Sequence, residues 1–95
     1  MPAFVIADIT VIDSAGFEQY RKEVPATIAA YGGRYLTRGG VTETIEGDWR
    51  PSRLTMLQFD SMERARAWYA SPEYQRILPL RTGSARTNLL FAEGL

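Results

Sequence analysis

Arginines and carboxylates gather in the middle of the sequence, and they are the first candidates for binding chemistry. Arg34, Arg38 and Arg53 lie near the ends of expected strands, and Glu46 and Asp48 lie in the segment between them. A guanidinium group binds a carboxylate or a phosphate through two parallel hydrogen bonds. We therefore expect Arg34 or Arg38 to hold a small anion. The alternative is that these arginines form ion pairs with Glu46 and Asp48, a common and individually weak contact.

An acidic residue, Asp8, interrupts the apolar stretch near the beginning of the sequence. Proteins create a general base by placing a carboxylate in an apolar cavity, where its charged form is desolvated. Asp8 is therefore the candidate catalytic base, if the protein is an enzyme. The alternative is that Asp8 pairs with an arginine at the edge of a sheet.

Two aromatic residues are further ligand-binding candidates. Tyr35 lies between the candidate arginines, and Trp49 lies in a Gly-Asp-Trp-Arg-Pro segment that is typical of a surface loop. An aromatic ring with one polar tip suits a ligand cavity and a protein interface equally well. We expect Trp49 either to cover a pocket or to pack on a partner subunit, and Trp68 and Tyr69 to belong to the core.

The sequence contains no histidine and no cysteine. This composition excludes thiol nucleophiles, disulfides, Ser-His-Asp triads and the usual zinc and copper sites. We expect no metal and no cofactor. The glycine pairs at positions 32–33 and 39–40 match neither a dinucleotide fingerprint nor a phosphate-binding loop, and backbone turns explain them.

Size and charge limit the partners. The 95 residues predict a single domain over residues 1–95, and so small a domain gains stability by associating with a second copy. Eleven basic and eleven acidic residues give no net charge, which argues against nucleic acid and anionic lipid as partners. The sequence shows neither a signal peptide nor an apolar run long enough to span a bilayer, so we expect a cytoplasmic location.

The elements that must position these residues follow from periodicity and from turn residues. Alternating apolar residues predict strands, and apolar residues at steps of three and four predict helices, with Pro25 kinking the first helix. Residues 41–46 are expected either to continue the second strand or to form its hairpin partner. The expected strands are 3–12, 34–38, 41–46, 54–60 and 87–93, and the expected helices are 14–31 and 62–79, the latter restarting at Ser71-Pro72-Glu73.

The order of the elements, β-α-β-β-α-β, predicts an α+β ferredoxin-like fold, an antiparallel sheet with both helices on one face. The other face would then expose apolar side chains such as Phe4, Ile6 and either Leu57 or Met56, a patch that a second copy should cover. Which of the two alternating sets of strand residues faces inward is left open by the sequence. Asp8, Thr10 and Gln58 are the polar residues expected to line a cavity between the two sheets.

Several motifs along the whole chain resemble the domain-of-unknown-function 1330 family of the dimeric α/β-barrel superfamily. These motifs are Phe4 to Asp8, Tyr20-Arg21, Tyr31-Gly32-Gly33-Arg34-Tyr35, Arg38-Gly39-Gly40, Glu46-Gly47-Asp48-Trp49, and Trp68-Tyr69 with Ser71-Pro72-Glu73-Tyr74. The resemblance implies a ferredoxin-like protomer and a homodimer with a barrel or cleft between its sheets. It implies no particular activity, because the family has no established activity.

Two main functions follow as expectations. The first is a homodimer that binds a small anionic or aromatic molecule in a cavity between its two sheets. The second is a cofactor-independent enzyme, similar to the monooxygenases and isomerases of the same superfamily, with Asp8 as base and Arg34 or Arg38 stabilising an enolate-like charge. A third possibility is a dimer that binds no small ligand.

Overall fold

A computed structural model describes all residues from Met1 to Leu95. The chain begins and ends with a long strand, and one helix, two strands and two further helices follow one another between them. The elements are β1 (Ala3–Val11), α1 (Ser14–Ala30), β2 (Arg34–Arg38), β3 (Leu54–Phe59), α2 (Met62–Ala70), α3 (Pro72–Thr82) and β4 (Ala85–Glu93). None of the helices is both long enough and apolar enough to cross a membrane.

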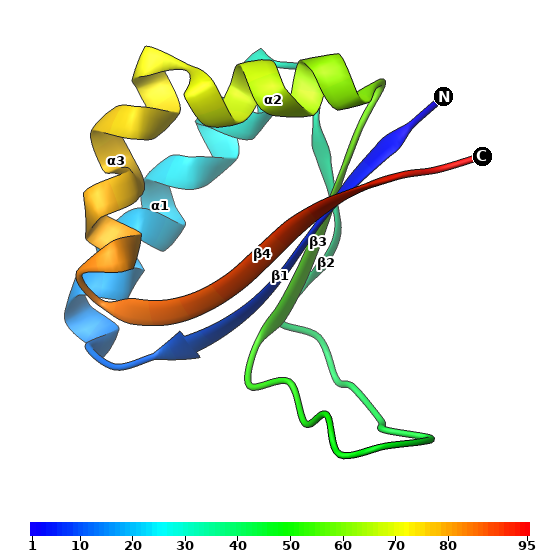
Figure 1. Cartoon of the computed structure of the whole chain (residues 1–95). Coiled ribbons are helices and arrows are strands. Elements are labelled where there is room, and N and C mark those ends of the chain that lie inside the picture. Colours follow the sequence, from blue (N-terminus) through cyan, green and yellow to red (C-terminus); the bar gives the residue numbers. More distant parts are fainter.

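The strands form one antiparallel sheet in the order β2-β3-β1-β4. All three helices lie on the same side of this sheet (Figure 1). This arrangement confirms the predicted ferredoxin-like α+β fold. It leaves β2 and β4 as edge strands and places β1, the strand that carries Asp8, in the interior of the sheet.

Local sequence signals account for the helix boundaries. The Asp13 side chain accepts a hydrogen bond from the Ala15 amide and caps α1, and the Ser61 and Ser71 hydroxyls cap α2 and α3 in the same way. The helix α1 continues through Pro25 and ends before Gly32, whose φ of 77° is the left-handed conformation that favours glycine. The helix α3 likewise continues through Pro79 to Thr82, three residues beyond the expected end.

The hydrophobic core lies between the sheet and the helices. Every second residue of β1, from Ala3 to Ile9, is buried there, and Phe59, Trp68, Tyr74 and Ile77 are almost inaccessible to solvent. The Trp68 indole also donates a hydrogen bond to the Thr27 hydroxyl. Burying large aromatic and aliphatic side chains is the main favourable contribution to folding in so small a protein.

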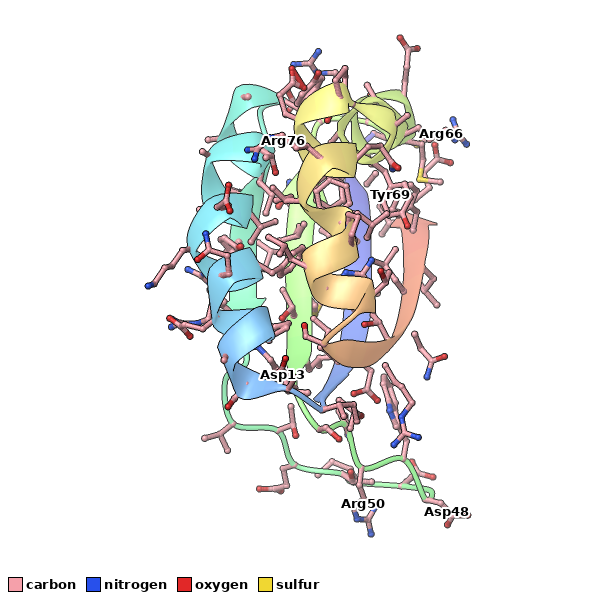
Figure 2. The ribbon with its side chains drawn as sticks, turned by 90° about the vertical axis from the view of Figure 1, so that its left-hand side faces the viewer. Asp13, Asp48, Arg50, Arg66, Tyr69 and Arg76 are labelled. Atoms are coloured by element: carbon pink, nitrogen blue, oxygen red, sulfur yellow. The ribbon has the colours of Figure 1, made fainter.

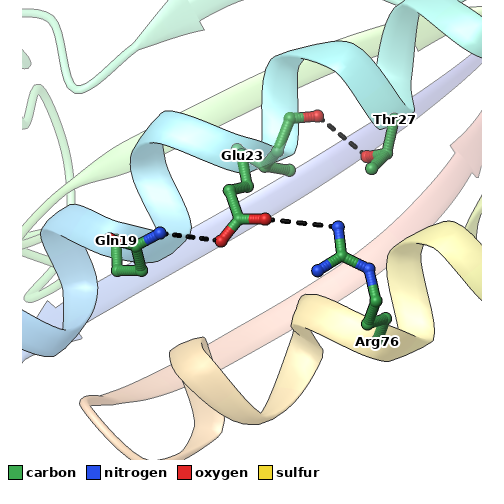
Figure 3. Close-up of polar contacts among 5 residues, drawn as sticks. Gln19, Glu23, Thr27 and Arg76 are labelled. Carbon is green, nitrogen blue, oxygen red and sulfur yellow. Dashed lines mark hydrogen bonds and ion pairs between the residues drawn. The ribbon is translucent and has the colours of Figure 1, made fainter.

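A polar bridge on the surface joins α1 to α3. The Glu23 carboxylate accepts hydrogen bonds from the Gln19 side chain on its own helix and from Arg76 on α3 (Figure 3). These two contacts, first Gln19 and then Arg76, lower the pKa of Glu23. The bridge joins the two helices on the side that faces away from the sheet, and so exposed a contact contributes little to stability.

The predicted strand over residues 41–46 is wrong. These residues form no strand and belong to a loop over residues 39–53 that projects beyond the sheet (Figure 1). The chain leaves the sheet at Gly39, whose φ is 71°, and the Val41 and Ile45 side chains are exposed. The segment pairs with no strand of the sheet, because it projects away from the sheet, and β3 is the strand that lies beside β2.

Candidate ligand site

A small cavity lies inside the protomer, between the helix-covered face of the sheet and the helices. Val5, Ala7 and Leu57 line it from the sheet, and Val24 and Trp68 line it from the helices. Its volume is about 40 Å³, which is room for a water molecule or for a group of a few heavy atoms. We call this space the inner cavity.

Three arginines surround the mouth of the inner cavity, and we call them the arginine cluster: Arg21 of α1, Arg38 at the end of β2 and Arg53 just before β3. The Arg38 guanidinium donates a hydrogen bond of 2.6 Å to the backbone carbonyl of Arg21 and lies 4.8 Å from the centre of the Tyr35 ring. Arg53 lies 5.4 Å from the centre of the Phe17 ring. Aromatic faces therefore hold these cations in place.

Few negative charges balance the arginine cluster. Its sole ion pair joins Arg21 to Glu18 at 3.2 Å, and both of these side chains are about half exposed. The pKa of Arg53 is lowered, first by partial burial and then by the positive charges of Arg21 and Arg38. Burial raises the pKa of Tyr35, although the neighbouring arginines act in the opposite direction. The arginines at the mouth of the cavity therefore repel one another, and a bound anion would reduce this repulsion.

A fourth arginine, Arg81, also lines the inner cavity but is buried. It comes from the last turn of α3 and is 5% exposed, with its guanidinium 5.9 Å from the centre of the Tyr20 ring. The Tyr20 and Tyr74 hydroxyls share a hydrogen bond of 2.8 Å nearby. Burial, reinforced by Tyr74, raises the pKa of Tyr20 well above its ordinary value, while Arg81 partly opposes this shift. No carboxylate forms an ion pair with Arg81.

The structure separates the predicted site residues into two groups. Arg38 and Tyr35 border the inner cavity, together with Arg53. Asp8, in contrast, lies on the face of the sheet that no helix covers. Its carboxylate accepts hydrogen bonds from the Trp49 indole at 2.8 Å and from the Ser52 amide at 3.1 Å. Both oxygens of Asp8 thus hold the 39–53 loop against the sheet, and Trp49 is 58% exposed there.

Arg34 also lies apart from the cavity. Its guanidinium donates a hydrogen bond of 3.0 Å to the Gln58 side chain, which occupies the neighbouring position on β3. The expected ion pairs with Glu46 and Asp48 are absent, because the two ion pairs of the chain are Arg21–Glu18 and Arg76–Glu23. Glu46 and Asp48 are instead exposed on the 39–53 loop, and Figure 2 shows Asp48 at the far end of this loop.

Sequence reasoning missed two of the arginines that line the cavity, although a signal existed for each. Arg81 follows Tyr74 and Ile77 at steps of three and four residues, so it occupies a buried position of the α3 stripe. Arg21 lies four residues after Phe17 and therefore at the margin of the α1 stripe. An arginine at such a position is rarely buried without a function or a partner.

Fold and sequence together give the class and the family. The chain is a ferredoxin-like α+β protein, and it belongs to the family described as Domain of unknown function (DUF1330), whose model matches residues 2–95. No curated protein matches the chain.

Solved structures share the fold at low sequence identity. A protein of unknown function from Rhodopseudomonas palustris has a TM-score of 0.79 at 13% identity, covering 99% of this chain and 82% of its own. A dimeric ferredoxin-like protein of unknown function from Jannaschia sp. CCS1 has a TM-score of 0.72 at 11% identity, covering 99% and 100%. SnoaB, a cofactor-independent oxygenase from Streptomyces nogalater, has a TM-score of 0.64 at 14% identity, covering 99% and 92%.

Proposed function

We propose that this protein binds a small organic anion at the mouth of the inner cavity. The observation that carries the proposal is the arginine cluster, where three guanidinium groups meet beside an apolar cavity with one carboxylate among them. A carboxylate bound to Arg38 and Arg53 would relieve their mutual repulsion and would form charge-assisted hydrogen bonds. The proposal places the ligand between sheet and helices, whereas the sequence predicted a cavity between two sheets.

The dimensions of the site favour a short ligand. A cavity of about 40 Å³ accepts a short apolar tip but not a fused ring system. The charged head of the ligand would stay among the arginines at the mouth, and the apolar tip would contact Val24 and Leu57 inside. Short-chain carboxylates meet both requirements.

Isothermal titration with carboxylates from acetate to pentanoate, and with the matching amides, tests this proposal. We expect the acids to bind and the amides to bind at least tenfold more weakly, because a hydrogen bond to a charged group contributes about 1.5–3 kcal/mol. Arg38→Gln and Arg53→Gln should each weaken binding by a similar factor. Arg34→Gln is the matched control, since Arg34 contacts Gln58 away from the cavity. Equal binding of acids and amides, or unchanged affinity in both variants, would refute the proposal.

A cofactor-independent enzyme is the second candidate, and the likeness of fold to SnoaB supports it. The arginine cluster could stabilise an enolate-like charge on a substrate in the inner cavity. Asp8 as the base would instead require a substrate between two sheets, because Asp8 lies on the other face. Turnover that is lost in Asp8→Asn while ligand affinity is retained would support this candidate, and turnover unaffected by the substitution would exclude Asp8 as the base.

We further propose that the chain forms a homodimer through the sheet face that no helix covers. Ile6, Met56 and Leu90 occupy neighbouring positions on three adjacent strands of that face, and Leu90 is 55% exposed. The neighbour from Jannaschia sp. CCS1 is described as dimeric. In sedimentation experiments Ile6→Asp should produce monomers or aggregates, whereas Ala26→Asp on the exposed side of α1 should not. A dimer that tolerates Ile6→Asp would contradict this interface.

A further inference from the structure

A second hollow lies between α3 and the edge strand β4, whereas the arginine cluster lies toward the other edge of the sheet, beside β2 and β3. Tyr69 of α2, Arg81 of α3, and Thr87, Leu89 and Phe91 of β4 line it, and we call it the α3–β4 groove. Figure 2 shows Tyr69 at the gap between α3 and β4. The groove is shallow and open to solvent, with a volume of about 530 Å³.

Two buried polar atoms without a partner belong to residues that line this groove. The Arg81 Nε and the Thr87 hydroxyl are both inaccessible to solvent, and neither forms a hydrogen bond with any group of the protein. They are the two side-chain atoms of the chain in this condition. A buried donor without a partner is costly to the fold, and more so when its group carries a charge. Two such groups beside one hollow indicate a ligand that accepts their hydrogens.

The chemistry of the groove limits the class of ligand. Arg81 supplies a positive charge, the Thr87 hydroxyl can donate a second hydrogen bond, and no acidic residue lines the groove. The Tyr69 and Phe91 rings lie edge to face, with centroids 6.2 Å apart, and provide an aromatic wall. Rings of this kind pack well against another planar ring. A planar carboxylate with one aromatic ring therefore matches the groove in charge, hydrogen bonding and shape.

We propose that the α3–β4 groove binds a monocyclic aromatic carboxylate, and that the Arg81 and Thr87 side chains turn toward it so that the Arg81 Nε and the Thr87 hydroxyl donate hydrogen bonds to its carboxylate. This site is separate from the arginine cluster, because Arg21, Arg38 and Arg53 do not line the groove. Arg81 and Leu89 border both the groove and the inner cavity. The Arg81 side chain thus separates the two proposed anion sites, the inner cavity and the α3–β4 groove.

Titration of the ¹⁵N-labelled protein with benzoate tests the proposal, with benzamide as the uncharged control. Benzoate should shift the Arg81 Nε–H signal and the amide signals of Thr87 and Leu89, and should leave those of Arg38 and Arg53 unchanged. Benzamide should bind about tenfold more weakly, as expected for the loss of a charge-assisted contact. Shifts confined to Arg38 and Arg53 would assign benzoate to the arginine cluster and would overturn this proposal.

Thr87→Val separates a ligand-binding role from a structural one. The hydroxyl has no partner within the protein, so its replacement by a methyl group should leave the melting temperature unchanged or raise it, while benzoate affinity falls severalfold. Arg81→Met should abolish benzoate binding, and Arg76→Met on the exposed side of the same helix is its control. Unchanged affinity in Thr87→Val, or a water molecule that joins Arg81 to Thr87 in a crystal soaked with benzoate, would refute the site.

Discussion

The two faces of the sheet contrast in how their apolar residues are used. On the helix-covered face, Val5, Leu57 and Phe59 are buried against the helices and form the core. On the other face, Ile6 and Met56 are only partly buried, and polar contacts hold the 39–53 loop nearby. Both faces are largely apolar in sequence. Apolar alternation therefore identifies surfaces that need a partner, but it does not identify the partner.

The largest expected effect distinguishes the two faces within a single strand. Phe59→Ala should lower the free energy of unfolding by about 3–5 kcal/mol, because it leaves a cavity in the core that the helices cannot fill. Met56→Ala, three residues earlier on the other face, should cost far less within one protomer and should instead weaken dimerisation. Chemical denaturation measures the first quantity and sedimentation the second. Equal losses of stability would show that both faces are equally packed within the protomer.

The buried pair of Tyr20 and Tyr74 should make the free energy of unfolding depend on pH in the alkaline range. The pKa of Tyr20 is raised in the folded state, so above about pH 10 the unfolded chain loses this proton and the folded chain retains it. The contribution of Tyr20 to the free energy of unfolding should then decrease by about 1.4 kcal/mol for each unit by which the pH rises. Denaturation at several pH values should show a shallower decrease in Tyr20→Phe, and identical slopes would contradict the burial of this hydroxyl.

The smallest expected effect on stability concerns the 39–53 loop, which Asp8 holds from the sheet face that no helix covers. Asp8→Ala removes the acceptor for the Trp49 indole and the Ser52 amide, both near the surface. We expect a loss of about 1 kcal/mol in stability and a faster exchange of the Ser52 amide hydrogen with solvent. Trp49→Phe, which removes one of the two hydrogen bonds, is the graded control. If exchange at Ser52 is unchanged in Asp8→Ala, the carboxylate does not hold the loop.

Parts of the fold could be read from the sequence because they depend on neighbouring residues. The capping residues Asp13, Ser61 and Ser71 lie where the helices begin, and β1 alternates as its residue types predict. Residues 41–46 show the limit of this approach. Their residue types suit a strand, but a strand forms only where the backbone pairs with another strand, and this loop pairs with none.

The candidate site was less accessible to sequence reasoning, since its residues come from separate elements. Arg38 and Tyr35 were predicted, whereas Arg21 and Arg81 join the cavity only because α1 and α3 cover the sheet together. Asp8 and Arg34 were predicted as site residues, and both lie on the other face of the sheet. A register shift between Tyr35 and Thr37 separates Arg34 from Arg38, which borders the cavity. A shift of one position along a strand reverses the face that a side chain occupies, so proximity in sequence does not establish a shared site.

The sequence by itself determined the order of helices and strands, the ferredoxin-like class and the family, since periodicity, caps and turn residues act over a few positions. Tertiary structure alone decided which face the helices cover, which arginines meet around one cavity, and that Arg81 is buried without an acidic partner. These features depend on strand register and helix packing, which bring together residues that lie tens of positions apart in the chain.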